Sequence, residues 1–129
     1  MSIFAVLSVF LGAGLGALLR WVLGAWLNPF FPPVPLGTLA ANLLGGLMIG
    51  FALVWFSRNP GVPPELRLLI ITGFLGGLTT FSTFSAEVVT TLVRGEYGWG
   101  LTIAASHLAG SLALTAAGIA LANLILART

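Results

Sequence analysis

Four long apolar runs separated by short connectors dominate this chain of 129 residues. They extend over about residues 2–27, 36–56, 66–93 and 99–126. At about 1.5 Å of rise per residue, a helix of each length can cross a hydrocarbon core about 30 Å thick. The connectors are too short to form a soluble domain. The sequence therefore predicts an all-α membrane protein with four transmembrane helices in a single domain, residues 1–129.

The composition excludes several classes of function. Only 6% of the residues are charged, against about 25% in soluble domains. Five arginines and three glutamates are scattered along the chain, so no cationic cluster is available to neutralise nucleic-acid phosphates. There is no Cys, which excludes disulfides and thiolate metal sites. With one His and no Asp, the chain has few groups for hydrolytic chemistry. We therefore predict that it is not an enzyme.

The connectors contain residues that stop helices. Four prolines fall within residues 29–35, and this density predicts a stiff, non-helical segment because proline lacks an N–H group. Residues 57–65 and 94–98 are polar turns. A cleaved signal peptide is the alternative for the first run. We favour a retained helix, because the run is longer than a signal core and no Lys or Arg precedes it.

The charges define a membrane orientation only weakly. With four spans, Arg58, Arg67 and Arg128 lie on the side of the termini, and Arg20 and Arg94 lie near the opposite side. So small a bias allows insertion in both orientations, and oppositely inserted chains could pair as an antiparallel homodimer. If Arg20 is not counted because it lies within a span, a single orientation is favoured.

The third run contains residues that a plain membrane helix does not need. Gly76 and Gly77 are followed by Thr79 and Thr80, and paired glycines let a backbone bend. A break at Gly76–Thr80 would free carbonyl groups in mid-membrane, which are suited to binding a cation. The alternative is a continuous helix in which Gly73 and Gly77 form a packing contact.

Polar but uncharged side chains, accompanied by two phenyl rings in the third run, recur in three of the runs. Each can be explained by packing or by bonds to the backbone, but together they supply amide and hydroxyl hydrogens and the positive edges of phenyl rings. Only Glu87 offers a carboxylate within a run, so an anion path is favoured over a cation path. The residues concerned are Asn42, Phe81, Ser82, Thr83, Phe84, His107, Ser111 and Thr115.

Three motifs resemble the bacterial fluoride channel family (Fluc, also called CrcB), over essentially the whole chain. They are Gly14-xx-Ala17-xx-Arg20, Gly37-Thr38-Leu39-xx-Asn42-xx-Gly45 and Gly73-Phe74-xx-Gly77-xx-Thr80-Phe81-Ser82-Thr83-Phe84-Ser85. The resemblance implies a channel that exports fluoride by passive electrodiffusion, with two pores in an antiparallel, dual-topology homodimer. It further implies a multi-pass protein of the bacterial inner membrane. A structural sodium ion at the dimer axis would be bound by the backbone carbonyls of Gly76 and Thr79.

The resemblance also implies roles for individual side chains. Phe81, Phe84 and Asn42 match the phenyl and amide positions of the pore, and Arg20 matches a vestibule arginine. The hydroxyl positions are Ser82, Thr83 and Thr115, and Ser111 shares the face of the last run with His107. We interpret His107 as a polar contact ahead of a proton sensor. We expect Glu87 to be shielded from the pore by hydroxyl groups or an arginine.

Two other functions fit part of the sequence. A proton-coupled exporter of the small multidrug resistance type has a similar length and span count, but it needs a carboxylate in its first span, where this chain has only Arg20 as a charged residue. A structural membrane subunit would explain the glycines. It would not explain Asn42 or the hydroxyl and phenyl residues of the third run.

Overall fold

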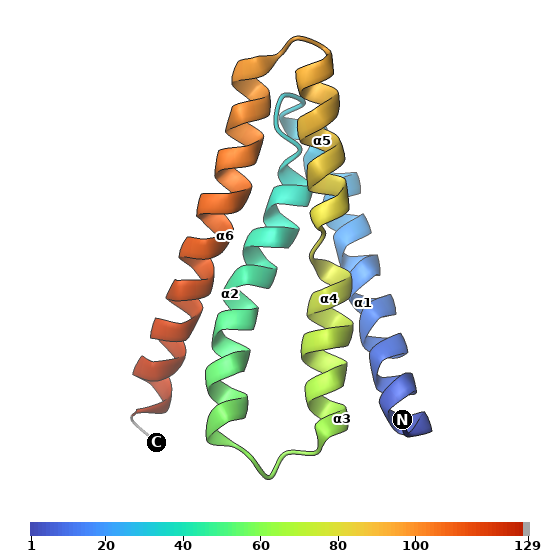
Figure 1. The fold of residues 1–129 in the computed structure, drawn as a ribbon, viewed down its shortest axis with the longest axis vertical. Helices are drawn as coiled ribbons and strands as arrows, with labels where there is room; N and C mark the ends of the chain where they lie inside the picture. The colour runs from blue at the N-terminus through green and yellow to red at the C-terminus, as the bar shows by residue number, and fades with distance from the viewer. Residues whose placement is uncertain (128–129) are drawn as a thin grey trace.

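The computed structural model describes residues 1–127, which form a bundle of four long helical spans (Figure 1). Each span is long and apolar enough to cross a membrane, which confirms the predicted number of spans. The N-terminus and the end of the last helix lie at the same end of the bundle, as an even number of crossings requires. The spans are Ile3–Phe30, Leu36–Arg58, Pro64–Val93 and Tyr97–Leu126.

The first, second and fourth spans are built almost entirely of α-helix, and the third is built of several shorter elements. The helices outside the third span are α1 (Ile3–Leu27), α2 (Leu36–Arg58) and α6 (Tyr97–Leu126), with a short 3-10 turn, η1 (Asn28–Phe30), after α1. The third span comprises α3 (Pro64–Arg67), the π-helix η2 (Leu68–Leu75), α4 (Gly76–Leu78) and α5 (Phe81–Val93).

Three details differ from the sequence prediction. Pro29 lies inside the turn η1, in a segment predicted to be non-helical, because a proline in a first turn sacrifices no hydrogen bond. The third span begins at Pro64 rather than at residue 66, since proline suits the first helical position. The last span begins at Tyr97 rather than at Trp99.

Glycines set the closest approaches between helices. Gly12 and Gly16 of α1 lie directly against the backbone of η2 and α4, and Gly73 and Gly77 lie in return against α1, so that a Cβ at any of them would meet backbone atoms. Gly50 makes the same kind of contact between α2 and α6. Such small-residue faces let membrane helices pack closely. Gly73 and Gly77 therefore form the packing contact of the alternative interpretation, but the third span is not the continuous helix that this alternative assumed.

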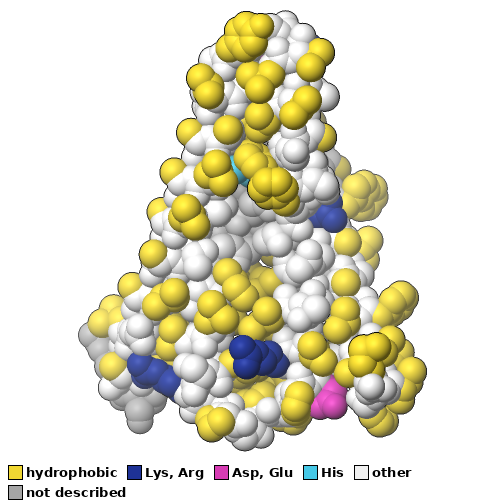
Figure 2. Space-filling model, viewed as in Figure 1, with side chains coloured by type: hydrophobic (Ala, Val, Ile, Leu, Met, Phe, Trp, Pro, Cys, Tyr) yellow, Lys and Arg dark blue, Asp and Glu magenta, His cyan; other side chains and the backbone are white. Residues whose placement is uncertain are grey.

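Many large apolar side chains point outward (Figure 2). Phe10, Trp21 and Trp26 are each at least 70% exposed. Such a surface would be unstable in water but suits lipid tails. The interior of the single chain includes two small apolar clusters, one around Phe84 and Ile103 and the other around Leu75 and Leu78. The chain is thus a multi-pass membrane protein.

Candidate functional site

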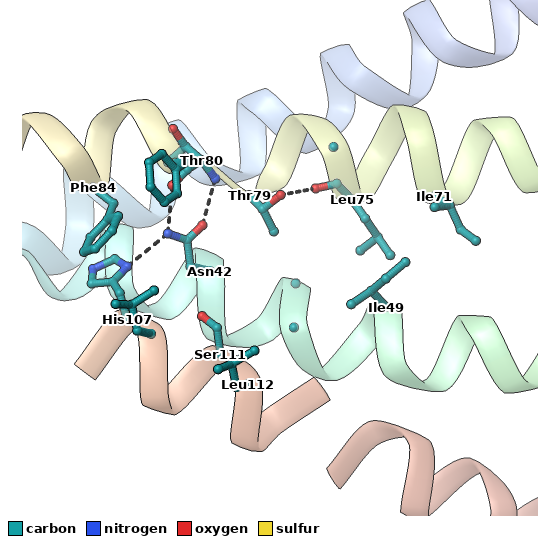
Figure 3. A pocket seen from close by; sticks show the side chains of 15 residues that line it. Asn42, Ile49, Ile71, Leu75, Thr79, Thr80, Phe84, His107, Ser111 and Leu112 are labelled. Atoms are coloured by element: carbon teal, nitrogen blue, oxygen red, sulfur yellow. Dashed lines mark hydrogen bonds between the residues drawn. The ribbon is translucent and has the colours of Figure 1, made fainter. Parts of the chain in front are cut away.

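A cavity of about 450 Å³ opens where the third span faces α2 and α6 (Figure 3). Its wall is mainly apolar, with polar groups concentrated at one end. The cavity is thus lined by side chains from three spans. Seven of the site residues that the sequence predicts line this cavity: Asn42, Gly76, Thr79, Phe81, Phe84, His107 and Ser111.

The backbone of the third span is extended at two residues beside this cavity. Thr79 has φ −82° and ψ 153°, and Thr80 has φ −149° and ψ 125°. These values lie outside the helical region. Helix α4 therefore ends at Leu78, and α5 begins at Phe81 with the Thr80 hydroxyl as its cap.

The extended pair redirects backbone donors away from two carbonyl groups. In a continuous helix, the N–H of Thr80 would donate to the carbonyl of Gly76, but here it donates to Asn42 Oδ1 at 2.7 Å. The N–H of Thr83 would serve the carbonyl of Thr79, but it donates to Thr80 Oγ1 at 3.1 Å. Both carbonyl oxygens thus lose their helical donors.

These two oxygens are a donor set that fits a hard cation. Carbonyl groups of unwound membrane helices are typical ligands of sodium, and Gly76 lies exposed at the surface of the single chain. No group of three His, Cys, Asp or Glu side chains is close enough to hold a metal within residues 1–127. The backbone oxygens of Gly76 and Thr79 are the cation ligands that the family resemblance implies, and both lack their helical donors here.

The Asn42 amide binds the extended segment on both sides of one residue. Its Oδ1 accepts from the Thr80 N–H, and its Nδ2 donates to the Thr80 carbonyl at 2.9 Å. Nδ2 also lies 3.0 Å from His107 Nδ1. Because Nδ2 can only donate, Nδ1 accepts, and the proton of the neutral imidazole is on Nε2. Asn42 therefore links α2, the third span and α6.

Three rings contact one another in a row beside Asn42. The rings of Phe84 and His107 are nearly parallel, with centroids 4.6 Å apart. Phe81 meets Phe84 edge to face at 5.5 Å. Phe84 and His107 are buried, whereas Phe81 is 74% exposed in the single chain. In an edge-to-face pair, the positive edge of one ring meets the negative face of the other.

The remaining hydroxyl residues of the prediction do not line the cavity, as far as the described part of the chain shows. Thr83 and Ser82 lie 3.3 Å and 3.2 Å from the Thr80 hydroxyl. The Thr115 hydroxyl donates to the Ser111 carbonyl at 2.9 Å, one turn earlier in α6. Ser111 itself reaches the cavity.

The two charged residues of the prediction, Glu87 and Arg20, are not among the residues that line this cavity. Glu87 accepts a hydrogen bond from the Thr38 hydroxyl at 2.6 Å, and its second oxygen, Oε2, is buried without a protein partner among residues 1–127. Nε2 of His107 is likewise buried without a protein partner among residues 1–127. Arg20 Nε donates to the Gly77 carbonyl at 3.0 Å. The sequence motifs contain Thr38, but nothing in its spacing alone indicates that it binds Glu87.

Comparisons with known proteins show which family and which relatives this chain resembles. Residues 7–119 match the family described as CrcB-like protein, Camphor Resistance (CrcB). Among the relatives, a protein of Burkholderia cenocepacia named Fluoride-specific ion channel FluC is 64% identical over 116 residues, which are 90% of this chain and 91% of that protein. Proteins of the same name from Burkholderia lata and Burkholderia pseudomallei are 63% and 59% identical over the same shares of both chains.

These relatives confirm two predictions made from the sequence. They are named as channels, a class of protein that is not enzymatic, in agreement with the prediction that the chain is not an enzyme. The family match covers all four spans except their outermost residues, and it includes every residue of the cavity. The chain therefore belongs to the CrcB family.

Proposed function

We propose that this protein is a fluoride-selective channel that exports fluoride by passive electrodiffusion. The observation that carries the proposal is the identity of 64% to a protein named as a fluoride-specific ion channel, over 90% of this chain. The chemistry of the cavity supports it. An anion needs hydrogen-bond donors and positive partial charge, and the cavity is lined by hydroxyl groups, ring edges and His107, whose Nε2–H has no protein partner among residues 1–127, without a fixed cation.

The proposed pore uses weak donors so that the ion can leave as readily as it enters. A fixed arginine in the pore would hold a small anion more tightly than conduction allows. Phenyl edges carry positive partial charge without a formal charge, and hydroxyl groups replace water around the dehydrated ion. The proposed lining combines four residues of the cavity, Asn42, Phe81, Phe84 and Ser111, with three hydroxyl residues that lie outside the cavity of the single chain, Ser82, Thr83 and Thr115.

We place the functional unit in an antiparallel homodimer with two pores, in the bacterial inner membrane. The small difference in arginine number between the two sides supports insertion in both orientations. A sodium ion at the dimer axis would be held by the carbonyls of Gly76 and Thr79 from each chain. When bound, it would supply positive charge to the negative ends of the interrupted spans.

The orientation can be tested without background labelling, because the chain has no Cys. Gly98 has open space where a side chain would extend, so Gly98→Cys is well suited to carry a membrane-impermeant thiol reagent. In sealed vesicles, dual insertion predicts that about half of the protein reacts before permeabilisation. Reaction of nearly all or nearly none would overturn the antiparallel dimer.

The channel activity is tested with purified protein in potassium-loaded liposomes and a fluoride electrode. We expect fluoride efflux to begin when valinomycin allows potassium to leave, because electrodiffusion needs a compensating charge movement. Liposomes without protein are the control. Efflux that ignores valinomycin, or that requires a proton gradient, would refute passive conduction.

A further inference from the structure

Arg20 is the single charged residue within α1 (Ile3–Leu27), and it contacts the end of α4. Its side chain is half-buried, and its Nε donates to the Gly77 carbonyl at 3.0 Å. In a continuous helix this carbonyl would accept from the N–H of Phe81, but Phe81 lies beyond the extended residues. The guanidinium therefore provides a donor at the position where the helix loses one.

The glycines of α1 explain how Arg20 reaches this carbonyl. Gly16 lies directly against the carbonyl of Phe74 and the N–H of Leu78. Arg20 follows Gly16 by four residues, so both lie on the same face of α1, one turn apart. The close packing of Gly16 on the third span thus places Arg20 over the last turn of α4.

Arg20 and Asn42 together bind two carbonyls of the interrupted segment, three residues apart. Arg20 takes the oxygen of Gly77, and Asn42 takes the oxygen of Thr80. Gly77 follows Gly76, and Thr80 follows Thr79. The carbonyls of Gly76 and Thr79 are the two described above as having lost their helical donors. Because successive peptide groups share a Cα atom, fixing one peptide plane restricts the next.

We propose that Arg20 is a positioning residue for the cation site at the interruption of the third span. By holding the Gly77 carbonyl, it fixes the direction of the adjacent Gly76 carbonyl toward the cation. This role rests on the proposed sodium site. It requires only Nε, so the terminal guanidinium nitrogens remain available to face water. The partial negative charge at the end of α4 offsets the arginine charge close to a second cation.

Two substitutions separate the hydrogen bond from the charge. Arg20→Met places a methyl group where Nε lies, and it removes both donor and charge. Arg20→Gln places an amide nitrogen at the same distance along the side chain, so it keeps a donor without the charge. Arg58→Met is the matched control, because Arg58 donates to Asn123 at the exposed end of the bundle.

The measurement is the thermal stability of purified protein during a sodium titration at constant ionic strength, with N-methylglucamine as the replacement cation. We expect Arg20→Met to raise the sodium concentration for half-maximal stabilisation about tenfold, in keeping with the loss of a charged hydrogen bond. Arg20→Gln should stay within about threefold of the wild type, and Arg58→Met should match it.

The outcomes distinguish this inference from the proposed sodium site. If sodium does not stabilise the wild-type protein, the sodium site fails and the role of Arg20 fails with it. If sodium stabilises the wild type and Arg20→Met equally, or if Met and Gln raise the required concentration equally, the positioning role alone is overturned. Should Arg20→Met not fold, Arg20→Lys replaces it, since Lys moves the donor outward. If Arg20→Lys then needed the same sodium concentration for half-maximal stabilisation as Arg20→Gln, the inference would be refuted.

Discussion

Replacing Asn42 with alanine removes the side chain that joins three spans. Three hydrogen bonds are lost, at 2.7, 2.9 and 3.0 Å, and they leave the backbone of Thr80 and the ring of His107 without these partners. Hydrogen bonds between membrane helices average about 0.6 kcal/mol and reach about 1.7 kcal/mol. We therefore expect Asn42→Ala to lower the free energy of unfolding by about 2 kcal/mol, and by no more than about 5 kcal/mol.

The assay is reversible unfolding in mixed micelles with increasing sodium dodecyl sulfate, followed by circular dichroism. Asn123→Ala is the control, because the one hydrogen bond of its side chain within residues 1–127 is the exposed bond from Arg58, and we expect a loss below about 1 kcal/mol. Equal losses for the two variants would refute the view that Asn42 holds the extended segment in place. Fluoride flux should fall in Asn42→Ala and be unchanged in Asn123→Ala.

Three further substitutions test separate parts of the structure. Gly16→Ala would force a methyl group onto the backbone of the third span, whereas Gly14→Ala meets open space; only the first should destabilise the protein in thermal unfolding, and equal effects would contradict the packing of α1. Phe81→Ile should reduce fluoride efflux from proteoliposomes at least about tenfold while leaving the dimer intact in size-exclusion chromatography, and undiminished efflux would remove this ring from the pore. Glu87→Gln keeps an acceptor for Thr38 and should leave the fluoride-to-chloride selectivity unchanged, so a large chloride leak in a flux assay would count against a shielded Glu87.

The number and extent of the spans could be predicted from the sequence because they depend on one-dimensional properties. A run of apolar residues must be helical in lipid, where the backbone has no other hydrogen-bond partners. The connectors, which are rich in helix-breaking residues, then define the ends of the spans to within a few residues. Pro29 and Pro64 were the exceptions, since proline is tolerated in the first turn of a helix and its position there depends on where the turn begins.

The site could be predicted only in part. The unusual residue types of the third run marked the stretch that contains the extended Thr79 and Thr80, and the motifs marked Asn42. Pattern alone did not reveal that both donor hydrogens of the Asn42 amide are used by Thr80 and His107. That pairing depends on how three spans are rotated about their axes.

Two further features depend on contacts between distant residues. The bond from Arg20 to Gly77 joins positions 57 residues apart, although the spacing of Gly12, Gly16 and Arg20 could have indicated that all three share one face. The π-helical turns of Leu68–Leu75 have no signal in the residue types. They occur in the segment that packs against α1, where the two backbones are in direct contact.

The most direct test of fluoride conduction is the reversal potential of currents in a planar bilayer that contains the purified protein. With a fluoride gradient across the bilayer and equal chloride on both sides, the channel should show currents that reverse at the equilibrium potential of fluoride. The potential should not move when chloride is replaced by a larger anion. Currents that reverse near zero, or that follow the chloride gradient, would contradict a fluoride-selective pore.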